Sequence, residues 1–282
     1  MKRKIALLSD AHGNRTAMEA VVADVEKEAV TDCWYLGDLL MPGPGSNEMF
    51  DLLERVNTSV QLLGNWESCL LEVLDEPLDP SEPEEVYLGM LAKYQLQRLD
   101  PKYIEVTRQL PMMQTQTVNG VTIQLSHNLP EKNYGGELGS NQSQEHFDLL
   151  FGNGVCDIAV YGHVHHQMMR YSSKGQLILN PGSIGQPYFM WSSFSEHLYA
   201  QYAVLSIDEK GVPEVQFKKV AYDVAAEQTL AETLELPFVE LYREQLETGK
   251  LYTHNKEVLT RVSEAHGYQA EVADYFPLRQ SQ

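Results

Sequence analysis

The feature that most constrains the fold is a short apolar run that recurs along the chain and each time stops at a polar side chain. The first three runs are IALLS (5–9), CWYLGD (33–38) and VQLLGN (60–65), and their continuous apolar character is typical of buried strands. Residues 18–29 and 47–56, between these runs, repeat apolar side chains with helical spacing. We therefore predict a βαβαβ unit, whose parallel strands bring their polar C-terminal ends to one edge of a sheet.

The pattern changes after this unit. Residues 75–85, DEPLDPSEPEE, hold six acids and three prolines, a composition that favours a solvated surface loop. The following apolar residues share one face of a helix, which we expect to end at Asp100-Pro101. Residues 75–101 are therefore interpreted as an acidic and helical insert that could form a cap beside the strand ends.

Consecutive strands are expected in the second half of the chain. Strand-like alternation covers 104–127, with an Asn119-Gly120 turn that indicates a hairpin. Further apolar runs lie at 156–166 and 176–183, and a second hairpin is expected around 208–211.

Beyond residue 222 the apolar spacing is helical to the end of the chain. We predict an α+β fold, a four-layer α/β/β/α sandwich in which two mixed sheets pack together and helices flank them. The main domain would span residues 1–222, including the insert at 75–101. Residues 223–282 would form a C-terminal helical extension docked on that domain.

The charge of the chain limits the classes of partner. Forty acidic against 21 basic residues give a net charge of −19, which repels nucleic-acid polymers and anionic membranes. Small phosphates stay compatible with this charge if bound metal ions supply local positive charge. The three cysteines occur singly, no run reaches membrane-spanning length, and the N-terminal apolar run has no cleavage site, so we expect a cytoplasmic protein.

The polar residues that end the strands have the chemistry of metal ligands. They are Asp10, His12, Asp38, Asn65, His127, His163 and His165. Two cations about 3.5–4 Å apart would use such a set, with one carboxylate shared between them. Ligands of this kind without thiolate suit manganese, iron or zinc. In GHVH the two histidines would share one face of a strand, whereas in a loop each could serve a different metal.

The order D-x-H, GD, GN, H and GHxH, each directly after an apolar strand, resembles the calcineurin-like metallophosphoesterase superfamily over about residues 4–220. The segment NPGSIGQP (180–187) resembles the one that closes the site and supports the ligand loops in bacterial phosphodiesterases of this superfamily. The resemblance implies that residues 1–222 form a metallophosphoesterase domain. It also implies two divalent or trivalent ions, manganese first, with iron or zinc as alternatives.

Carried over by position, the resemblance assigns each ligand to a metal. The first metal would be held by Asp10, His12, Asp38 and His165. The second metal would be held by Asp38, Asn65, His127 and His163, with Asp38 as the bridge. Catalytic roles are implied for Asp38, Asn65 and His127, and a metal-bound hydroxide is the implied nucleophile. His166 has no matching role and is interpreted as a supporting or exposed residue.

Trp66 departs from the resemblance, because most of the superfamily has histidine at this position, where it protonates the leaving oxygen. Indole has one N–H donor and no accessible acid function. Losing a general acid typically costs 10²–10⁴-fold when the leaving group is poor, and less when it is already a weak base. We therefore expect substrates with nucleotide-phosphate or aryl-oxide leaving groups.

The resemblance favours an asymmetric diadenosine tetraphosphate hydrolase, producing ATP and AMP, with general phosphodiesterase activity. Its partner would be a small nucleotide, and the oligomeric state is left open. The residues predicted to bind substrate are Asn14, Trp66, Tyr134 and Tyr188. Each has an alternative interpretation: Asn14 could cap a helix, and the aromatic residues, with Phe189 and Trp191, could instead pack in the interior.

Two other functions are weighed against this hypothesis. A cyclic-nucleotide phosphodiesterase would have to expel a ribose alkoxide without the acid that is missing at Trp66. A non-catalytic scaffold is the second alternative, since the retromer subunit of this fold works through its surface. Retention of all seven ligand positions argues against a scaffold.

Overall fold

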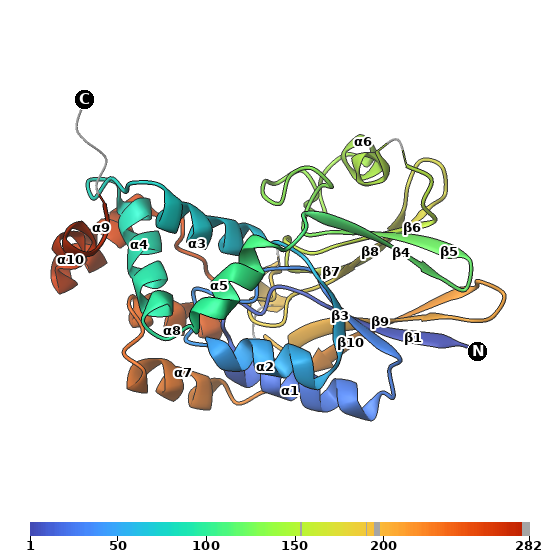
Figure 1. Cartoon of the computed structure of the whole chain (residues 1–282), viewed down its shortest axis with the longest axis horizontal. Helices are drawn as coiled ribbons and strands as arrows, with labels where there is room; N and C mark the ends of the chain where they lie inside the picture. Colours follow the sequence, from blue (N-terminus) through green and yellow to red (C-terminus); the bar gives the residue numbers. More distant parts are fainter. Residues whose placement is uncertain (153, 190, 195–197, 278–282) are drawn as a thin grey trace.

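A computed structural model describes residues 1–152, 154–189, 191–194 and 198–277 of the chain. Two five-stranded sheets form its centre, as the sequence predicts (Figure 1). The first sheet has the order β10-β9-β1-β2-β3. Its strands are β1 (Arg3–Leu8), β2 (Asp32–Tyr35), β3 (Thr58–Gln61), β9 (Ala200–Ile207) and β10 (Pro213–Val220). The strands β1, β2 and β3 are parallel, and β9 joins them as an antiparallel neighbour of β1.

The second sheet has the order β4-β5-β6-β8-β7. Its strands are β4 (Met113–Val118), β5 (Val121–Ser126), β6 (Ile158–Tyr161), β7 (Gln167–Tyr171) and β8 (Leu177–Pro181). The pair β4–β5 is the hairpin predicted at Asn119-Gly120, and β5, β6 and β8 run parallel. Strand β9 continues into β10 through the second predicted hairpin.

Alternation along the strands explains why the sheets stack. In β1, Ile5 and Leu7 belong to the apolar layer between the sheets, whereas Ala6 and Leu8 face the helices on the other side. From the second sheet, Ile123 and other apolar residues complete the inner layer. Successive side chains of a strand point to opposite faces, so a strand buried on both faces has to be apolar throughout.

Helices cover both outer faces (Figure 1). Helices α1 (Arg15–Lys27) and α2 (Asn47–Arg55) pack on the first sheet. Helix α6 (Gln144–Asp148) and the 3-10 turn η1 (Leu149–Phe151) cover the second sheet through Phe147 and Leu150. The order helix, sheet, sheet, helix is the predicted four-layer sandwich.

A group of helices lies at the end of the sandwich where β1, β2 and β3 terminate (left in Figure 1). It consists of α3 (Asn65–Asp75), α4 (Pro83–Leu96), α5 (Pro101–Arg108), α7 (Val224–Thr233), α8 (Val239–Thr248), α9 (Lys256–His266) and α10 (Tyr268–Tyr275). A short 3-10 turn, η2 (Ser192–Phe194), precedes β9. Helices α9 and α10 pack on α4, and their apolar residues join the core that lies under α1 and α2. The division of the chain at residue 222 stays a prediction.

The structure corrects one element of the sequence interpretation. The predicted strand-like region begins at residue 104, but residues 101–108 form helix α5 and strand β4 starts only at Met113. Helix α4 already ends at Leu96, and Asp100-Pro101 starts the next helix, because the Asp100 carboxylate accepts a hydrogen bond from the backbone N–H of Lys102 and Pro101 occupies the first turn. The acidic loop is also shorter than expected, since α3 extends to Asp75 and α4 begins at Pro83.

Within the described part of the chain, every helix is too short or too polar to span a bilayer.

Candidate metal centre

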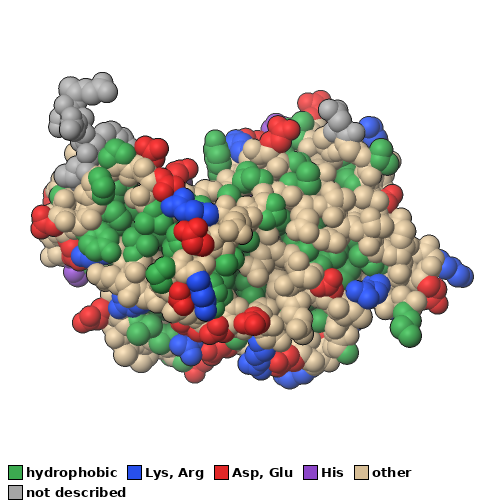
Figure 2. Space-filling view, in the orientation of Figure 1, with side chains coloured by type: hydrophobic (Ala, Val, Ile, Leu, Met, Phe, Trp, Pro, Cys, Tyr) green, Lys and Arg blue, Asp and Glu red, His purple; other side chains and the backbone are tan. Residues whose placement is uncertain are grey.

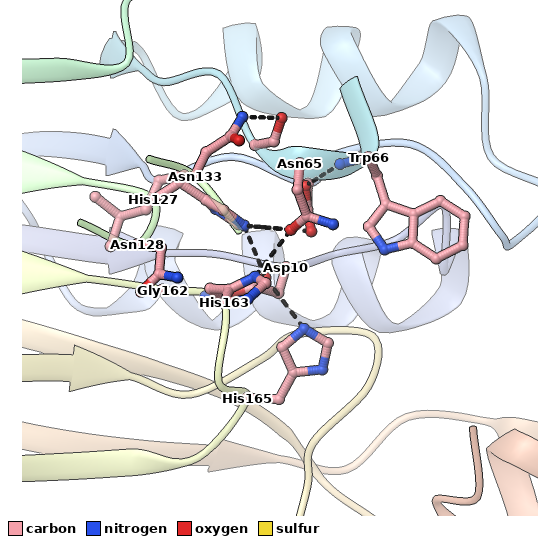
Figure 3. Close-up of polar contacts among 12 residues, drawn as sticks. Asp10, Asn65, Trp66, His127, Asn128, Asn133, Gly162, His163 and His165 are labelled. Atoms are coloured by element: carbon pink, nitrogen blue, oxygen red, sulfur yellow. Dashed lines mark hydrogen bonds and ion pairs between the residues drawn. The ribbon is translucent and has the colours of Figure 1, made fainter. Parts of the chain in front are cut away.

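The predicted metal ligands come together at one edge of the two sheets (Figure 3). The first sheet contributes Asp10 and His12 after β1, Asp38 after β2, and Asn65 at the start of α3. The second sheet contributes His127, which follows β5, and the pair His163 and His165, which lie in the loop after β6. The site therefore straddles both layers of the sandwich.

The ligand atoms form two groups that share one carboxylate. One group consists of Asp10, His12, Asp38 and His165, and the other contains Asp38, His127 and His163, with the ligand atoms of each group within 4.8 Å of one another. Asn65 joins the second group, since its Oδ1 lies 3.1 Å from Nε2 of His127 and 2.8 Å from Nδ1 of His163. The two histidines of GHVH thus serve different groups, which is the loop arrangement considered for this motif.

Backbone strain is concentrated at these residues. Five of the seven predicted ligands have φ between 51° and 65°, the left-handed region that side chains other than glycine rarely adopt. These five are Asp10, His12, Asp38, His163 and His165. Each such residue costs folding free energy, and strain of this kind persists where the surrounding structure holds a functional geometry.

The residue before Asn65 has to be glycine, because the side chains of Asp38 and Glu67 lie close to its Cα. A Cβ on Gly64 would lie 2.1 Å from Oδ1 of Asp38 and 2.6 Å from Oε2 of Glu67. Any side chain at this position would therefore displace the shared carboxylate.

Each ligand histidine is oriented by a backbone carbonyl. Nδ1 of His12, His127 and His165 lies 2.8 Å from the carbonyl oxygen of Met41, Leu36 and Gln186, respectively. In His163 the roles of the nitrogens are reversed, with Nε2 3.0 Å from the carbonyl oxygen of Gly135. In the neutral tautomer that places the proton at the carbonyl, the other nitrogen would present a lone pair to the cluster, as metal-binding imidazoles do.

The unpaired atoms of the cluster fit a cation. Oδ1 of Asp10 and Oδ2 of Asp38 are buried and accept no well-aligned hydrogen bond from the described residues, although Nε2 of His165 lies 3.2 Å from the first and Nε2 of His127 3.3 Å from the second. The Nε2 atoms of His12 and His165 lie 3.1 Å apart, and both would be acceptors in the tautomer with its proton at the carbonyl. Buried acceptors that face one another in this way are costly unless a positive charge lies between them.

Burial and the two carboxylates shift the pKa values of the imidazoles in opposite directions. Burial lowers the pKa of His12 and of His163 to about 4. Burial also acts on His127, but the negative charges of Asp38 and Asp10 outweigh it and raise its pKa to about 10. Burial would raise the pKa of Asp10, yet the neighbouring His165, His127 and His12 hold it well below its usual value. Positive charge at the centre of the cluster is therefore favoured.

Glu67 is a site residue that the sequence interpretation missed. Its Oε2 accepts hydrogen bonds from the backbone N–H groups of Asp38 (2.7 Å) and Gly64 (3.0 Å), and its Oε1 accepts one from Leu39 (2.7 Å). Burial and the adjacent Asp38 raise the pKa of Glu67 to about 7. The Gly64-x-x-Glu67 spacing is that of a capping box at the start of α3, a signal that could have identified it.

The segment NPGSIGQP supports the ligand loops, as its resemblance implies. The backbone N–H of Gly185 and the hydroxyl of Ser183 both donate to the carbonyl oxygen of Asp10. Asn180 Nδ2 donates to the carbonyl oxygen of Gly162, directly before His163. This segment therefore ties the loop after β1 to the loop after β6.

Trp66 lies at the border of the cluster (Figure 3). Its backbone N–H donates to Oδ1 of Asp38 at 2.9 Å, and its indole meets the His12 ring edge to face at 5.7 Å between centroids. A second edge contact joins it to Tyr87 of α4. Trp66 thus packs partly into the core and partly along the site.

A cleft of about 840 Å³ opens beside the cluster. Asn65, Trp66, His163 and His165 line its inner side. The opposite wall comes from α4, from the segment between α8 and α9 and from the start of α9, and its residues include Glu84, Leu88, Leu251, His254 and Lys256. The insert therefore lies beside the site, as expected, whereas the contribution of the C-terminal segment was not predicted.

The other predicted substrate residues have different surroundings. Asn14 is fully buried, its Oδ1 accepts the backbone N–H of Ala17 at the start of α1, and its Nδ2 donates to the hydroxyl of Tyr222. The structure thus shows the helix cap, and a contact between Asn14 and substrate stays a prediction that these bonds do not support. Tyr134 and Tyr188 are exposed, and Tyr188 borders a cavity that also reaches His163.

Comparison with known proteins shows the family. The model of the calcineurin-like phosphoesterase superfamily domain matches residues 3–210. The uncharacterized protein MJ0912 of Methanocaldococcus jannaschii is 26% identical over 202 residues, which cover 66% of this chain and 78% of that protein. The symmetrical bis(5'-nucleosyl)-tetraphosphatase of Klebsiella pneumoniae is 41% identical over 69 residues, or 24% of each chain.

A crystal structure agrees with this result at the level of the fold. The metallophosphoesterase from Sphaerobacter thermophilus superposes with a TM-score of 0.67 and 22% identity, covering 88% of this chain and 100% of that one. The chain described here therefore belongs to the calcineurin-like phosphoesterase superfamily.

Proposed function

We propose that this protein is a dinuclear metal-dependent phosphohydrolase that cleaves phosphodiester and phosphoanhydride bonds of nucleotides. Its preferred substrate in this proposal is diadenosine tetraphosphate, split asymmetrically into ATP and AMP. The observation that carries the proposal is the pair of ligand groups that share Asp38 and open onto a cleft of about 840 Å³.

The chain's own residues have distinct tasks in this reaction. Asp10, His12, Asp38 and His165 would hold one ion, and Asp38, Asn65, His127 and His163 the other. Two such ions, when bound, lower the pKa of water and polarise phosphoryl oxygens. The Glu67 carboxylate fixes the backbone at Asp38, because it accepts hydrogen bonds from the backbone N–H groups of Asp38 and Leu39. Manganese is the proposed ion, with iron or zinc as the alternatives.

The composition of the cleft supports a leaving group that is a weak base. Trp66 and Leu88 cannot donate a proton to a leaving oxygen, and burial raises the pKa of the cleft-lining Cys69 thiol to about 12. Glu84 is held below its usual pKa, chiefly by its hydrogen bond with His254. Without a proton donor at the position of Trp66, an alkoxide would leave slowly, whereas a nucleotide phosphate leaves without a strong acid.

The substrate is proposed to be a small nucleotide and not a nucleic-acid polymer. Basic side chains are scattered singly among acidic ones on the face of the molecule in Figure 2, and the net charge is −19. Polymers bind through continuous basic surfaces. The tetraphosphatase of Klebsiella pneumoniae, which matches over a short segment, supports the substrate class, but its name specifies the symmetrical reaction.

An activity panel with added Mn²⁺ tests the proposal. The substrates are diadenosine tetraphosphate, an aryl phosphodiester, an aryl phosphomonoester and cyclic AMP. We expect strong turnover of the first two and weak turnover of the others. Chromatography of the tetraphosphate products separates ATP plus AMP from two molecules of ADP.

Matched variants identify the site responsible. Asp38→Asn removes the shared carboxylate and should lower turnover by at least about 100-fold, because ligand and supporting residues of metal sites carry effects of this size. Asp274→Asn changes an exposed carboxylate and should leave activity unchanged. Hydrolysis of cyclic AMP as fast as that of the tetraphosphate would contradict the argument from the leaving group. Purified protein without bound metal and without activity would favour the scaffold function.

A further inference from the structure

A second cavity, separate from the cleft beside Trp66, also borders the metal cluster. It has a volume of about 360 Å³, and its lining includes Gly135, Gly136, His163, His166 and Tyr188. His163 borders this cavity and the cleft alike. The cluster therefore opens onto two separate hollows.

The second cavity leads into a larger aromatic pocket. The two share His166 and Tyr188 in their linings, and the aromatic pocket has a volume of about 800 Å³. Its aromatic residues are Tyr188, Phe189, Trp191, Phe194, Tyr199 and Phe217. The glycine-bordered cavity thus connects the metal cluster, at His163, with the aromatic pocket.

The aromatic side chains are presented to solvent and are not packed beneath the C-terminal helices. Trp191 is 67% exposed, Phe194 65% and Tyr188 44%. Phe189 and Phe194 meet edge to face at 6.3 Å, and Nζ of Lys219 lies 5.7 Å from the Phe189 ring centroid. Large aromatic surfaces gathered around a hollow are unusual on a protein unless a ligand or partner covers them.

We infer that this pocket is a subsite for a nucleobase at the far end of a two-armed substrate. The inference rests on the proposed function, and it deepens that function by locating the site of the second nucleoside of a two-nucleoside substrate. One arm would occupy the cleft beside Trp66. The other would pass the glycines and stack its base on the aromatic residues around Tyr188.

Physical chemistry favours this occupant. A base has a flat π surface that stacks on Tyr, Phe and Trp whatever its hydrogen-bonding edge. The glycine-bordered cavity, with a volume of about 360 Å³, has room for phosphate groups. Lys219 supplies a cation beside the aromatic rings. The contiguous lining places the base and the metal cluster along one path.

Kinetics of the metal-loaded enzyme test the inference through two substrates. Tyr188→Ala and Phe194→Ala should each raise KM for diadenosine tetraphosphate by about 10-fold, the size expected for loss of one stacked base. Turnover of 4-nitrophenyl methyl phosphate, which is too small to reach the pocket, should stay within about 2-fold. Tyr171→Ala is the matched control, since Tyr171 is 58% exposed on β7 and does not line the pocket.

Binding of adenosine provides a readout that needs no turnover. Adenosine should quench the tryptophan fluorescence of the protein in a saturable way, and Trp191→Phe should remove the part of this quenching that comes from Trp191. Tyr188→Ala should remove the same part. Tyr171→Ala should keep that part. If diadenosine tetraphosphate is not hydrolysed but this binding pattern holds, the base subsite stands and the proposed substrate fails.

Three results would overturn the inference. Equal losses on both phosphate substrates would show that Tyr188 only stabilises the fold. Unchanged kinetics together with unchanged adenosine binding would show that the pocket is not used. A dimer in light scattering that Tyr188→Ala converts to a monomer, with no adenosine binding, would identify the surface as a protein interface.

Discussion

At the scale of single residues, Trp66 connects the metal cluster to substrate choice. Its backbone N–H binds Asp38, so the position is part of the support of the shared carboxylate whatever the side chain. Its indole contacts His12 and lines the cleft. In the proposed reaction the side chain would determine which chemistry is available to the leaving group, while the backbone N–H supports Asp38.

Trp66→His should increase activity toward alkyl phosphodiesters by about 10-fold or more, because a general acid contributes about 10²–10⁴-fold for poor leaving groups. Activity toward diadenosine tetraphosphate should change little. Steady-state rates on a series of diesters with leaving groups of increasing basicity measure the effect. Trp66→Phe keeps a ring without an acid and should show no gain. A gain of equal size in Trp66→Phe would show that space, and not protonation, limits alkyl substrates.

At the scale of elements, the site is built where strands end and the backbone turns sharply. The loops after β1, β2 and β6 hold five ligands at positive φ, and the start of α3 supplies Asn65 and Glu67. Glu67 joins α3 to the loop after β2 through the N–H groups of Asp38 and Leu39. The geometry of the cluster therefore depends on close contacts between these loops.

Gly64→Ala should weaken manganese binding by about 10–100-fold, the range found when residues that support metal ligands are changed. Its Cβ would lie 2.1 Å from Oδ1 of Asp38, so the carboxylate has to move. Titration with Mn²⁺ measures the affinity, and circular dichroism reports whether the variant is folded. Gly136→Ala, where a Cβ meets nothing within 4 Å, is the control. Wild-type affinity in a folded Gly64→Ala protein would contradict this account of the loops.

At the scale of the whole molecule, the two sheets and the C-terminal helices act together. The first sheet supplies Asp10, His12, Asp38 and Asn65, and the second supplies the remaining three histidines. Apolar side chains of the C-terminal helices join the core beneath α1 and α2. The buried carboxylates lie at the junction of these parts, so binding at the site is coupled to the stability of the fold.

Removal of the metals should lower the melting temperature by about 5–10 °C. A ligand present at 100 times its Kd stabilises a protein by about 2.7 kcal/mol, and about 1 kcal/mol corresponds to 2–4 °C for a chain of this size. Differential scanning calorimetry with a chelator, and then with Mn²⁺ restored, measures the shift. In Asp38→Asn, removal of the metals should shift the melting temperature by less than in the unchanged protein. If neither chelator nor Mn²⁺ changes the melting temperature, the cluster is not a metal site.

Much of this architecture could be predicted from local patterns. Apolar runs that end at Asp10, Asp38 and Asn65 predicted parallel strands with their polar ends at one edge, and β1, β2 and β3 confirm it. The hairpin at Asn119-Gly120 was also predicted correctly, because a turn depends on only a few neighbouring residues. The error at residues 101–108 arose because Asp100-Pro101 was interpreted as a helix end, whereas it caps the start of α5.

The sequence by itself determined which residues have side chains of the metal-ligand type and where most strands form, because both are set by the identity and spacing of neighbouring side chains. Only the tertiary structure decided that His163 and His165 serve different groups and that Glu67 holds the loop of Asp38. It also placed the segment between α8 and α9 on the wall of the cleft. These features depend on contacts between residues far apart in the chain, and such contacts leave no periodic pattern within any one segment.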